Sequence, residues 1–191
     1  MPRKTTLPAL AVVLAAIAGP AAAECTLVAT PVTQGLARPW GIGVLGDGRV
    51  LVTERGGRLS LIDLASGERL SVTGTPTVYA QGQGGLLDIA PAIDFADSAR
   101  VYFTFSEIRG VGLAGTALAT ATLGGTESRP MLVDVEIIFR QSNPTASDYH
   151  FGSRVVPAPD GTLFVTIGDR GEAERAQDPE DHAGSVLHLN A

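Results

Sequence analysis

The sequence predicts an all-β fold in which one small sheet is repeated about three times along the chain. Short apolar runs rich in β-branched residues are separated by turns that contain glycine and aspartate, a pattern typical of β-hairpins. The same hairpin pattern returns downstream of its first occurrence. No convincing helical periodicity follows the N-terminal leader. These three observations favour strands over helices throughout.

The predicted strands fall into three groups. In the first group a turn at Gly46-Asp47-Gly48 joins the first two runs, and the runs cover residues 40–45, 50–54 and 59–62. The second group is a looser copy with a turn at Asp97-Ser98, and its runs cover residues 86–93, 101–106, 117–123 and 132–139. The third group repeats the first around Pro159-Asp160-Gly161, with runs at residues 154–158 and 163–167.

Repeated units of this kind indicate a β-propeller. Units of roughly 40 to 50 residues made of several short strands are typical of propeller blades, each of which buries its faces against its neighbours. The turn aspartates Asp47, Asp97 and Asp160 each mark one such unit. A β-sandwich with similar hairpins is the alternative that the pattern alone leaves open.

The N-terminus has the organisation of a secretory signal peptide. Arg3 and Lys4 precede an apolar stretch at 7–18, and a run of small residues ends at Ala23. A membrane-spanning helix needs roughly 20 apolar residues, so this stretch is too short to remain as an anchor. We therefore expect residues 1–23 to be a signal peptide, residues 24–191 to be the propeller domain, and the protein to be periplasmic or secreted without a membrane span.

Composition excludes several classes of partner and site. The net charge is −6 and the arginines are scattered singly, so no basic stripe is available for a nucleic acid or an anionic membrane. Cys25 is the only cysteine, which excludes an internal disulfide framework and a thiolate metal cluster. The sequence contains no GxSxG, HExxH or Walker lysine motif, which hydrolases and phosphoryl-transfer enzymes of those types need.

One glycine motif matches a dinucleotide-binding pattern without its context. Residues 110–115 read GxGxxG, but the residues after them alternate like a strand and do not open a helix. A dinucleotide site needs the helix N-terminus for its pyrophosphate. We therefore interpret residues 110–115 as a glycine-rich loop.

Of the three histidines, His150 is the candidate general base. It stands immediately before the third hairpin, which ends at Asp169, so a hairpin that folds back brings Asp169 near His150. A carboxylate there can fix the tautomer of the imidazole and stabilise its protonated form, while a structural contact is the plainer alternative. His182 lies in a polar loop among carboxylates and is interpreted as a surface or structural residue, and His188 alternates with apolar residues as a strand side chain does.

Five blocks of the sequence resemble the glucose/sorbosone dehydrogenases, in the order in which that family has them. The most specific block is HFGSRVVPAPDGTLFVTIGDRG, residues 150–171. The others are residues 35–59, 82–90, 133–141 and 176–190. The resemblance implies a six-bladed β-propeller, of which this chain supplies about three blades.

The resemblance also implies a reaction and its site. The C1 hydroxyl of an aldose is oxidised to a lactone, pyrroloquinoline quinone (PQQ) accepts the hydride, Ca²⁺ binds the quinone, and an external electron acceptor reoxidises it. By motif match, His150 is the general base, Asp169 orients it and Gln83 lines the cofactor and substrate pocket. Gln83 could instead cap the backbone of its turn, and Arg154 could form an ion pair without a role in the chemistry.

Departures from the family pattern bear on specificity and completeness. Tyr149 stands where some members have an acidic residue, and Ser185 and His188 stand where basic residues are usual. In the family, the basic residues that grip the quinone and most calcium ligands follow the part that this chain resembles, so no metal ligand is assigned here. We expect a truncated N-terminal half, ending after Leu189-Asn190 in mid-blade, that alone binds quinone poorly and turns over little.

Two other functions fit the same fold. The first is a secreted, non-enzymatic propeller that binds a sugar or a protein, and the fold alone cannot choose between it and the dehydrogenase. The second is a calcium-dependent propeller lactonase. That reading needs a cluster of inward Glu, Asn and Asp ligands, which these residues do not supply.

Overall fold

The computed structural model describes residues 27–190. The chain divides into two units, residues 1–30 and residues 31–191, and the architecture below is that of the second unit. The predicted signal peptide and Cys25 lie outside the described residues. Within residues 27–190, no helix is both long enough and apolar enough to cross a membrane.

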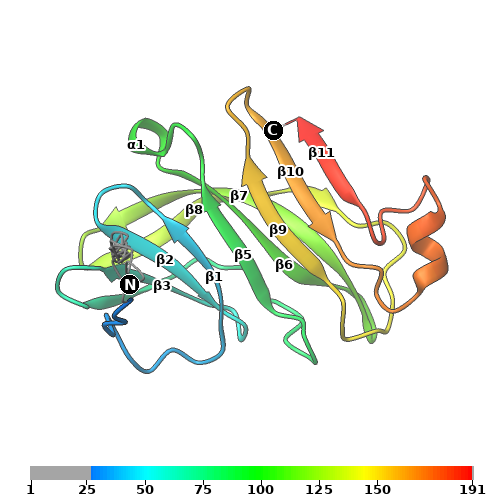
Figure 1. The fold of residues 1–191 in the computed structure, drawn as a ribbon, viewed down its shortest axis with the longest axis horizontal. Coiled ribbons are helices and arrows are strands. Elements are labelled where there is room, and N and C mark those ends of the chain that lie inside the picture. Colours follow the sequence, from blue (N-terminus) through cyan, green and yellow to red (C-terminus); the bar gives the residue numbers. More distant parts are fainter. Residues whose placement is uncertain (1–26, 191) are drawn as a thin grey trace, which may run out of the picture. The chain divides into compact units, whose positions relative to one another are not determined.

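Three antiparallel sheets, which we call blades 1, 2 and 3, follow one another along the second unit (Figure 1). Blade 1 consists of β1 (Pro39–Val44), β2 (Arg49–Glu54), β3 (Arg58–Asp63) and β4 (Arg69–Val72). Blade 2 consists of β5 (Leu86–Pro91), β6 (Arg100–Gly110), β7 (Leu113–Thr126) and β8 (Arg129–Arg140). Blade 3 consists of β9 (Gly152–Pro157), β10 (Thr162–Ile167) and β11 (Val186–Asn190). Within each blade, strands adjacent in sequence are adjacent in the sheet.

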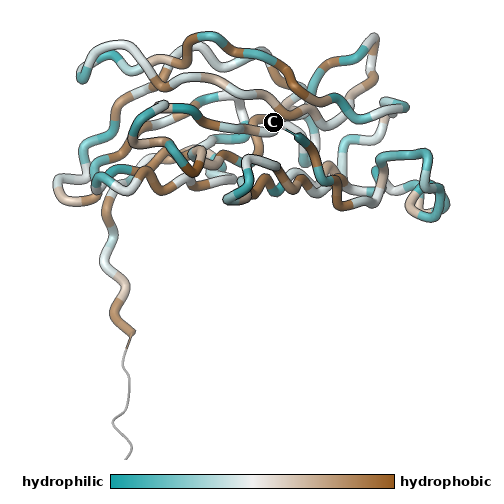
Figure 2. Tube along the Cα trace, turned by 90° about the horizontal axis from the view of Figure 1, so that it is seen from above, coloured by the Kyte–Doolittle hydropathy of each residue, from teal (hydrophilic) through white to brown (hydrophobic). Residues whose placement is uncertain are grey.

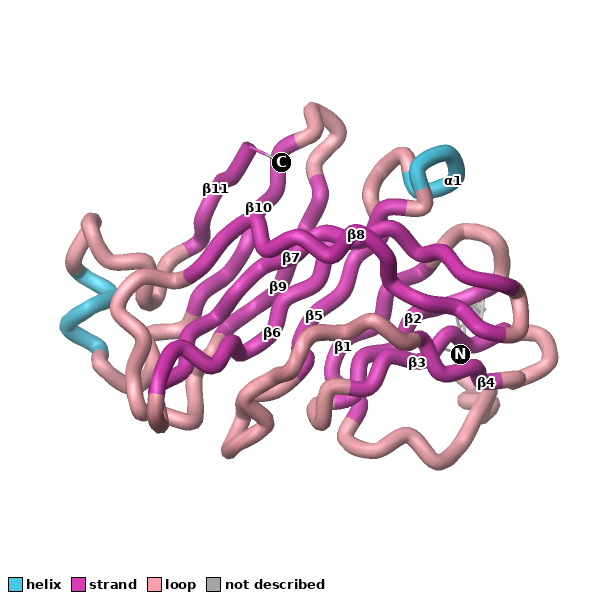
Figure 3. The backbone as a smooth tube through the Cα atoms, turned by 180° about the vertical axis from the view of Figure 1, so that it is seen from behind, coloured by secondary structure: helices cyan, strands magenta, loops and turns pink. Residues whose placement is uncertain are grey.

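The all-β prediction is confirmed, and the differences from it are local. Figure 3 shows strands as nearly all of the regular structure. Within residues 27–190, the helical segments are α1 (Phe95–Ser98) and η1 (Ala173–Gln177). The turn predicted at Asp97-Ser98 is the end of α1, which stops at Ala99 in the left-handed region, with a φ of 51°. The interpretation of residues 110–115 as a loop is wrong for most of the stretch: only residues 111 and 112 form the turn, Gly110 ends β6, and residues 113–115 are paired in β7.

Side chains buried between neighbouring blades form the core. One apolar cluster lies between blades 1 and 2 and includes Leu51, Leu59, Phe103 and Phe105. A second lies between blades 2 and 3 and includes Tyr102, Leu118, Val155 and Val165. In Figure 2, hydrophobic and hydrophilic positions alternate along much of the chain, and hydrophilic positions are frequent in the outer loops. Because each blade buries its face against the next, this is the packing of a β-propeller.

The first strands of the three blades, β1, β5 and β9, start at one end of the molecule. Strand β5 contacts both β1 and β9. Backbone hydrogen bonds join the segments at this end, from Arg55 N, just after β2, to Arg38 O, from Leu86 N to Arg55 O and from Gln83 N to Asp148 O. We call this end the entry end. The opposite end, which carries the turns after β1 and β9, is the turn end.

Replacing Gly41 with alanine is expected to destabilise the protein by about 1–3 kcal/mol, because β1 lies against β5 without space for a methyl group. An added Cβ would lie 2.9 Å from Asp88 Oδ1 and 2.9 Å from the carbonyl oxygen of Leu87. Urea unfolding measures the loss. The matched control is Gly56→Ala, where an added Cβ meets nothing within 4 Å. It should change stability by less than about 0.5 kcal/mol, and equal losses in the two variants would contradict the tight contact at Gly41.

Candidate active site

His150 and Asp169 lie next to each other at the entry end of blade 3. Strands β9 and β10 pair antiparallel with Gly152 opposite Ile167, so the two residues before β9, His150 and Phe151, meet the segment after β10. His150 Nδ1 lies 2.8 Å from Asp169 Oδ1. The predicted proximity of the two side chains is therefore confirmed. The side chain of His150 is 52% exposed, so the imidazole is accessible from solvent.

Gln83 contacts the backbone of His150 from blade 2. Its Oε1 accepts a hydrogen bond of 2.8 Å from His150 N, and its own backbone N donates to Asp148 O at 2.7 Å. The structure thus brings together all three residues that the sequence singled out. The carboxamide caps a backbone N–H, but this group belongs to the candidate base and not to the turn of Gln83 itself, as the plainer interpretation had expected.

The backbone at His150 is held in an uncommon conformation. Its φ is 54°, in the left-handed region, which histidine, asparagine and aspartate adopt more readily than most residues. Such a conformation costs of order 1–3 kcal/mol and persists where neighbours enforce it. Here Gln83 fixes the N–H of His150, and Gly168 N donates to the carbonyl of the next residue, Phe151, at 3.1 Å. The imidazole therefore projects from a restrained loop.

The charge at Asp169 defines what the imidazole can do. The backbone N–H of Gly171 donates to Asp169 Oδ1 at 2.8 Å, and this bond, followed by the contact with His150, lowers the pKa of Asp169. An ionised carboxylate can only accept hydrogen bonds, so the contact favours the imidazole tautomer that carries its proton on Nδ1. The lone pair of Nε2 is then left to accept a proton from a ligand, with Asp169 stabilising the resulting imidazolium.

Tyr149 flanks the candidate base. Its ring packs edge-on against the imidazole of His150, with the two centroids 4.7 Å apart. The same ring lies over the backbone of Gly171, where any Cβ would overlap it. The side chain next to the candidate base is therefore an aromatic ring that the segment after Asp169 supports.

An ion pair with a buried carboxylate joins blades 2 and 3 beneath this loop. Asp88 on β5 is only 1% exposed in its side chain, and its Oδ1 accepts from Arg154 Nη1 on β9 at 2.9 Å. Its Oδ2 accepts from the backbone N of Val155 at 2.9 Å. Burial raises the pKa of Asp88 against the opposing effect of these two donors. Arg154 thus forms the ion pair that its plainer interpretation predicts, with a partner that the sequence analysis missed.

The other two histidines have structural contacts. His182 Nδ1 accepts from the backbone N of Ser142 at 3.0 Å, and its ring packs against Phe139. His188 lies on β11, where its ring stacks on Phe164 with centroids 4.4 Å apart. Both interpretations made from the sequence are confirmed, and neither ring lies in the His150–Asp169 pair.

A second polar cluster ties the loop after Asp169 to the loop before His150. Arg175 on η1 donates through Nε and Nη2 to the carboxylate of Asp181, at 2.8 and 3.0 Å. Asn143 Nδ2 donates to the same carboxylate at 3.2 Å, and its carbonyl accepts from Arg175. The guanidinium, acting first through these hydrogen bonds, holds the pKa of Asp181 well below its usual range.

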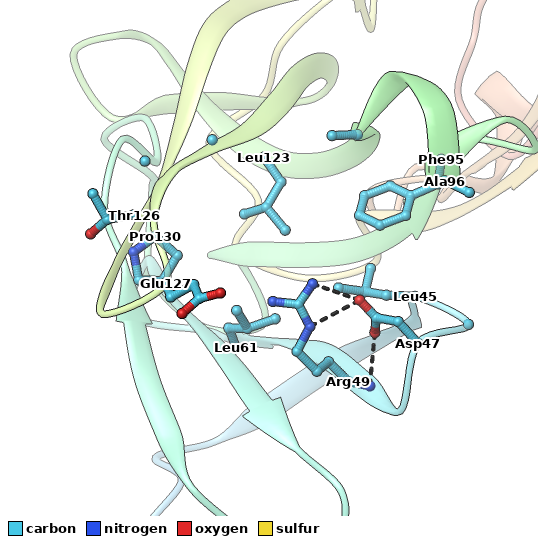
Figure 4. Close-up of a pocket in the computed structure, with 14 residues that line it drawn as sticks. Leu45, Asp47, Arg49, Leu61, Phe95, Ala96, Leu123, Thr126, Glu127 and Pro130 are labelled. Carbon is cyan, nitrogen blue, oxygen red and sulfur yellow. Dashed lines mark hydrogen bonds and ion pairs between the residues drawn. The ribbon is translucent and has the colours of Figure 1, made fainter.

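A hollow of about 560 Å³ lies at the turn end, away from this cluster. Figure 4 shows its apolar floor of Leu45, Leu61 and Leu123, with Arg49 already paired to Asp47. Its lining includes no histidine. Among residues 27–190, no group of three or more His, Cys, Asp or Glu side chains is arranged to hold a metal ion. The candidate chemistry therefore centres on His150 at the entry end.

The fold and the site define a class of protein, namely a β-propeller that presents a carboxylate-held imidazole at the start of an inner strand. A family model described as Glucose / Sorbosone dehydrogenase matches residues 36–191. The chain belongs to the glucose/sorbosone dehydrogenase family, which confirms the resemblance noted from the sequence.

Named relatives agree with this assignment. The aldose sugar dehydrogenase YliI of Escherichia coli (strain K12) is 35% identical over 169 residues, which cover 88% of this chain and 45% of that protein. The soluble aldose sugar dehydrogenase of Escherichia coli in its apo-form has a TM-score of 0.75 and 35% identity, covering 81% of this chain and 44% of the other. The PQQ-bound aldose sugar dehydrogenase of Streptomyces coelicolor has a TM-score of 0.76 and 27% identity, covering 86% and 48%. The chain spans less than half the length of these relatives.

The ion pair of Asp181 should make stability depend on pH in the acid range. A carboxyl whose pKa is lowered by folding contributes stability that is present above its unfolded pKa, about 4, and is lost as the pH falls through its folded value. Asp181→Asn removes this contribution. The melting temperature of the variant should therefore lie below that of the wild type near neutral pH, and the gap should shrink below about pH 4.

The control for this comparison is Asp97→Asn, which removes an exposed carboxylate on α1. It should leave the melting temperature nearly unchanged at either pH. A gap between wild type and Asp181→Asn that stays constant from neutral to acid pH would contradict the ion-pair explanation.

Proposed function

We propose that the protein is part of a PQQ-dependent sugar dehydrogenase that oxidises the C1 hydroxyl of an aldose to a lactone. The observation that carries the proposal is the 2.8 Å contact between His150 and Asp169 at the entry end of a propeller of this family. The printed names of the relatives, which describe aldose sugar and glucose dehydrogenases, support the substrate class.

In this proposal the residues of the chain accept one proton from the sugar and stabilise the charge that results. His150 Nε2 takes the proton of the C1 hydroxyl as hydride leaves C1, so one O–H bond and one C–H bond break and the C=O bond of the lactone forms. Asp169 holds the Nδ1 proton and stabilises the imidazolium that results. Gln83 keeps the backbone of His150 in place. When bound, PQQ supplies the acceptor for the hydride.

The donors at the entry end fit an anionic, oxygen-rich quinone in part. Gln83 is exposed, and its hydrogen bond to His150 uses only the Oε1 of the carboxamide, which leaves its N–H donors for a quinone oxygen. The side chain of Arg154, which contacts Asp88 through Nη1, is 59% exposed. We propose that Gln83 contributes to holding the quinone. The Ca²⁺ that the family resemblance implies has no ligand cluster within residues 27–190, so we propose that its ligands come from other blades of the ring.

We further propose that activity belongs to the complete six-bladed ring. The relatives are more than twice as long as the part that this chain matches, and the three blades described here leave apolar side chains of β1 and β10 exposed, including Ile42, Val44 and Phe164. Blades are stable when both faces are covered. We therefore expect the 191-residue chain alone to bind quinone weakly and to be inactive. We also propose a periplasmic or secreted location and an external electron acceptor.

Replacing His150 with asparagine should abolish most of the activity while preserving the fold. Asparagine tolerates the left-handed backbone of this position but cannot act as a base. In the full natural polypeptide that carries this chain, loaded with PQQ and Ca²⁺, kcat for aldose oxidation should fall about 10²- to 10⁴-fold. Dye-linked turnover over a panel of aldoses measures it.

The matched histidine control is His188→Asn, which should keep most of the wild-type rate. Full activity in His150→Asn would overturn the assignment of the base. Sugar binding without turnover by the folded, loaded wild type would replace the proposed function with a non-enzymatic binding propeller.

Asp169→Asn tests the orientation of the base. An amide at this position can donate an N–H to Nδ1, which favours the tautomer that protonates Nε2 and removes the acceptor for the sugar proton. We expect kcat to fall about 10²- to 10⁴-fold with little change in KM. Asp160→Asn, which alters a turn carboxylate bonded to Thr162 at the turn end, is the control. Equal rates for Asp169→Asn and wild type would show that the carboxylate has no part in the reaction.

A further inference from the structure

The segment 168–171 contacts the loop 147–151 residue by residue. Gly168 N donates to Phe151 O at 3.1 Å, and Asp169 Oδ1 lies 2.8 Å from His150 Nδ1. Arg170 N donates to His150 O at 3.4 Å. The candidate base and the residue after it are thus fixed by one short segment, and Arg170 follows Asp169 in that segment.

The side chain of Arg170 lies inside the protein under the loop of His150. Arg170 is 1% exposed and is the largest fully buried side chain among the described residues. Its guanidinium carbon lies 3.5 Å from the ring centroid of Phe151, and its Nη2 donates to the carbonyl of Ser147. Ser147 and Phe151 are the two ends of the loop that presents His150, so one planar group holds both ends.

The environment of this guanidinium is unusual for a residue that only stabilises a fold. Within residues 27–190 it forms no ion pair with a carboxylate, and its Nε and Nη1 atoms have no hydrogen-bond partner. Burial, followed by the nearby charge of Arg175, lowers the pKa of Arg170 to about 10, so the group stays charged at neutral pH. A buried charge without a paired carboxylate adds little stability compared with an apolar side chain of similar size. A guanidinium instead fixes the positions of the groups that it contacts, because its hydrogen-bond donors are held in one plane.

Backbone strain is concentrated in the same place. His150 and Arg170 have φ values of 54° and 58°, and Ser153 at the start of β9 has a φ of 102°. Non-glycine residues in this region need their surroundings to hold them there. The buried guanidinium and its two contacts supply such a constraint from below the loop.

We propose that Arg170 is a positioning residue that sets the place of the His150 imidazole relative to Asp169, by holding Ser147 and Phe151 at the two ends of the loop. It does not touch the reacting atoms. The geometric part of this inference stands on the contacts alone, and its consequence for turnover rests on the proposed function.

The test compares Arg170→Met and Arg170→Lys in the full natural polypeptide, labelled with ¹⁵N-histidine. Methionine keeps apolar volume over Phe151 but loses the charge and the donor to Ser147, and lysine keeps a charge and one donor without the planar face. In the wild type, the Nδ1 proton held by Asp169 should exchange slowly and give a sharp imidazole signal, which the His150→Asn variant assigns. In Arg170→Met this signal should broaden or disappear while the melting temperature stays within a few degrees of wild type. Arg170→Lys should recover it in part.

The same variants are then assayed with PQQ, Ca²⁺ and aldose. We expect kcat of Arg170→Met to fall about 10- to 100-fold at unchanged KM, because a misplaced base weakens the transition state without affecting sugar binding. Arg140→Met, which removes a surface arginine paired with Glu107, is the control and should change neither the signal nor kcat.

A second variant keeps the inference testable if Arg170→Met does not fold. Phe151→Leu removes the aromatic face and leaves the guanidinium, and it should loosen the His150 signal in the same way. A folded Arg170→Met or Phe151→Leu variant with an unchanged His150 signal overturns the proposal. An inactive wild type with a sharp His150 signal that Arg170→Met abolishes refutes the proposed function and leaves the positioning role supported.

Discussion

The candidate site depends on the close approach of the first strands of the three blades. Asp88 lies at this junction, where its buried carboxylate accepts from Arg154 and from the backbone of β9. Gly41 allows β1 to reach the same point because it has no side chain. The loops that lead into β5 and β9 end at these packed strands and are held close together, and Gln83 can therefore reach the backbone N–H of His150. A shift between blades 2 and 3 would move the candidate base directly.

Much of the fold could be predicted because most strands are separate apolar runs bounded by glycine and aspartate turns. The runs around Asp47 and Asp160 match β1, β2, β9 and β10 within a few residues. Strand β4 was missed because it has four residues and one buried side chain, Val72, so no alternation can be read from it. The short α1 was expected as a turn because a single helical turn leaves no periodicity in the sequence.

The parts of the site that could be predicted are local in the chain. His150 and Asp169 flank one hairpin, so antiparallel pairing alone brings them together. Asp88 and Arg170 were missed because their contacts join segments distant in sequence, and neither burial nor strand packing between blades is written in a local pattern. Asp88 did leave a signal, since it is a charged residue in the middle of the apolar run 86–90, and such a residue needs a buried partner. Arg170 left none, because an arginine beside an aspartate reads as exposed.

Because β1, β5 and β9 all run in the same direction, the candidate site lies at one end of these strands and their connecting turns lie at the other. The entry end carries the strained loop and its supporting contacts, whereas the turn end carries the hydrogen-bonded turn around Asp160, which ends β9 away from His150. Exposed turns of this kind accept inserted residues with little cost to the core. An anchoring tag or a fused partner placed between Asp160 and Gly161 would therefore fasten the protein to a solid support with its imidazole facing the surrounding liquid.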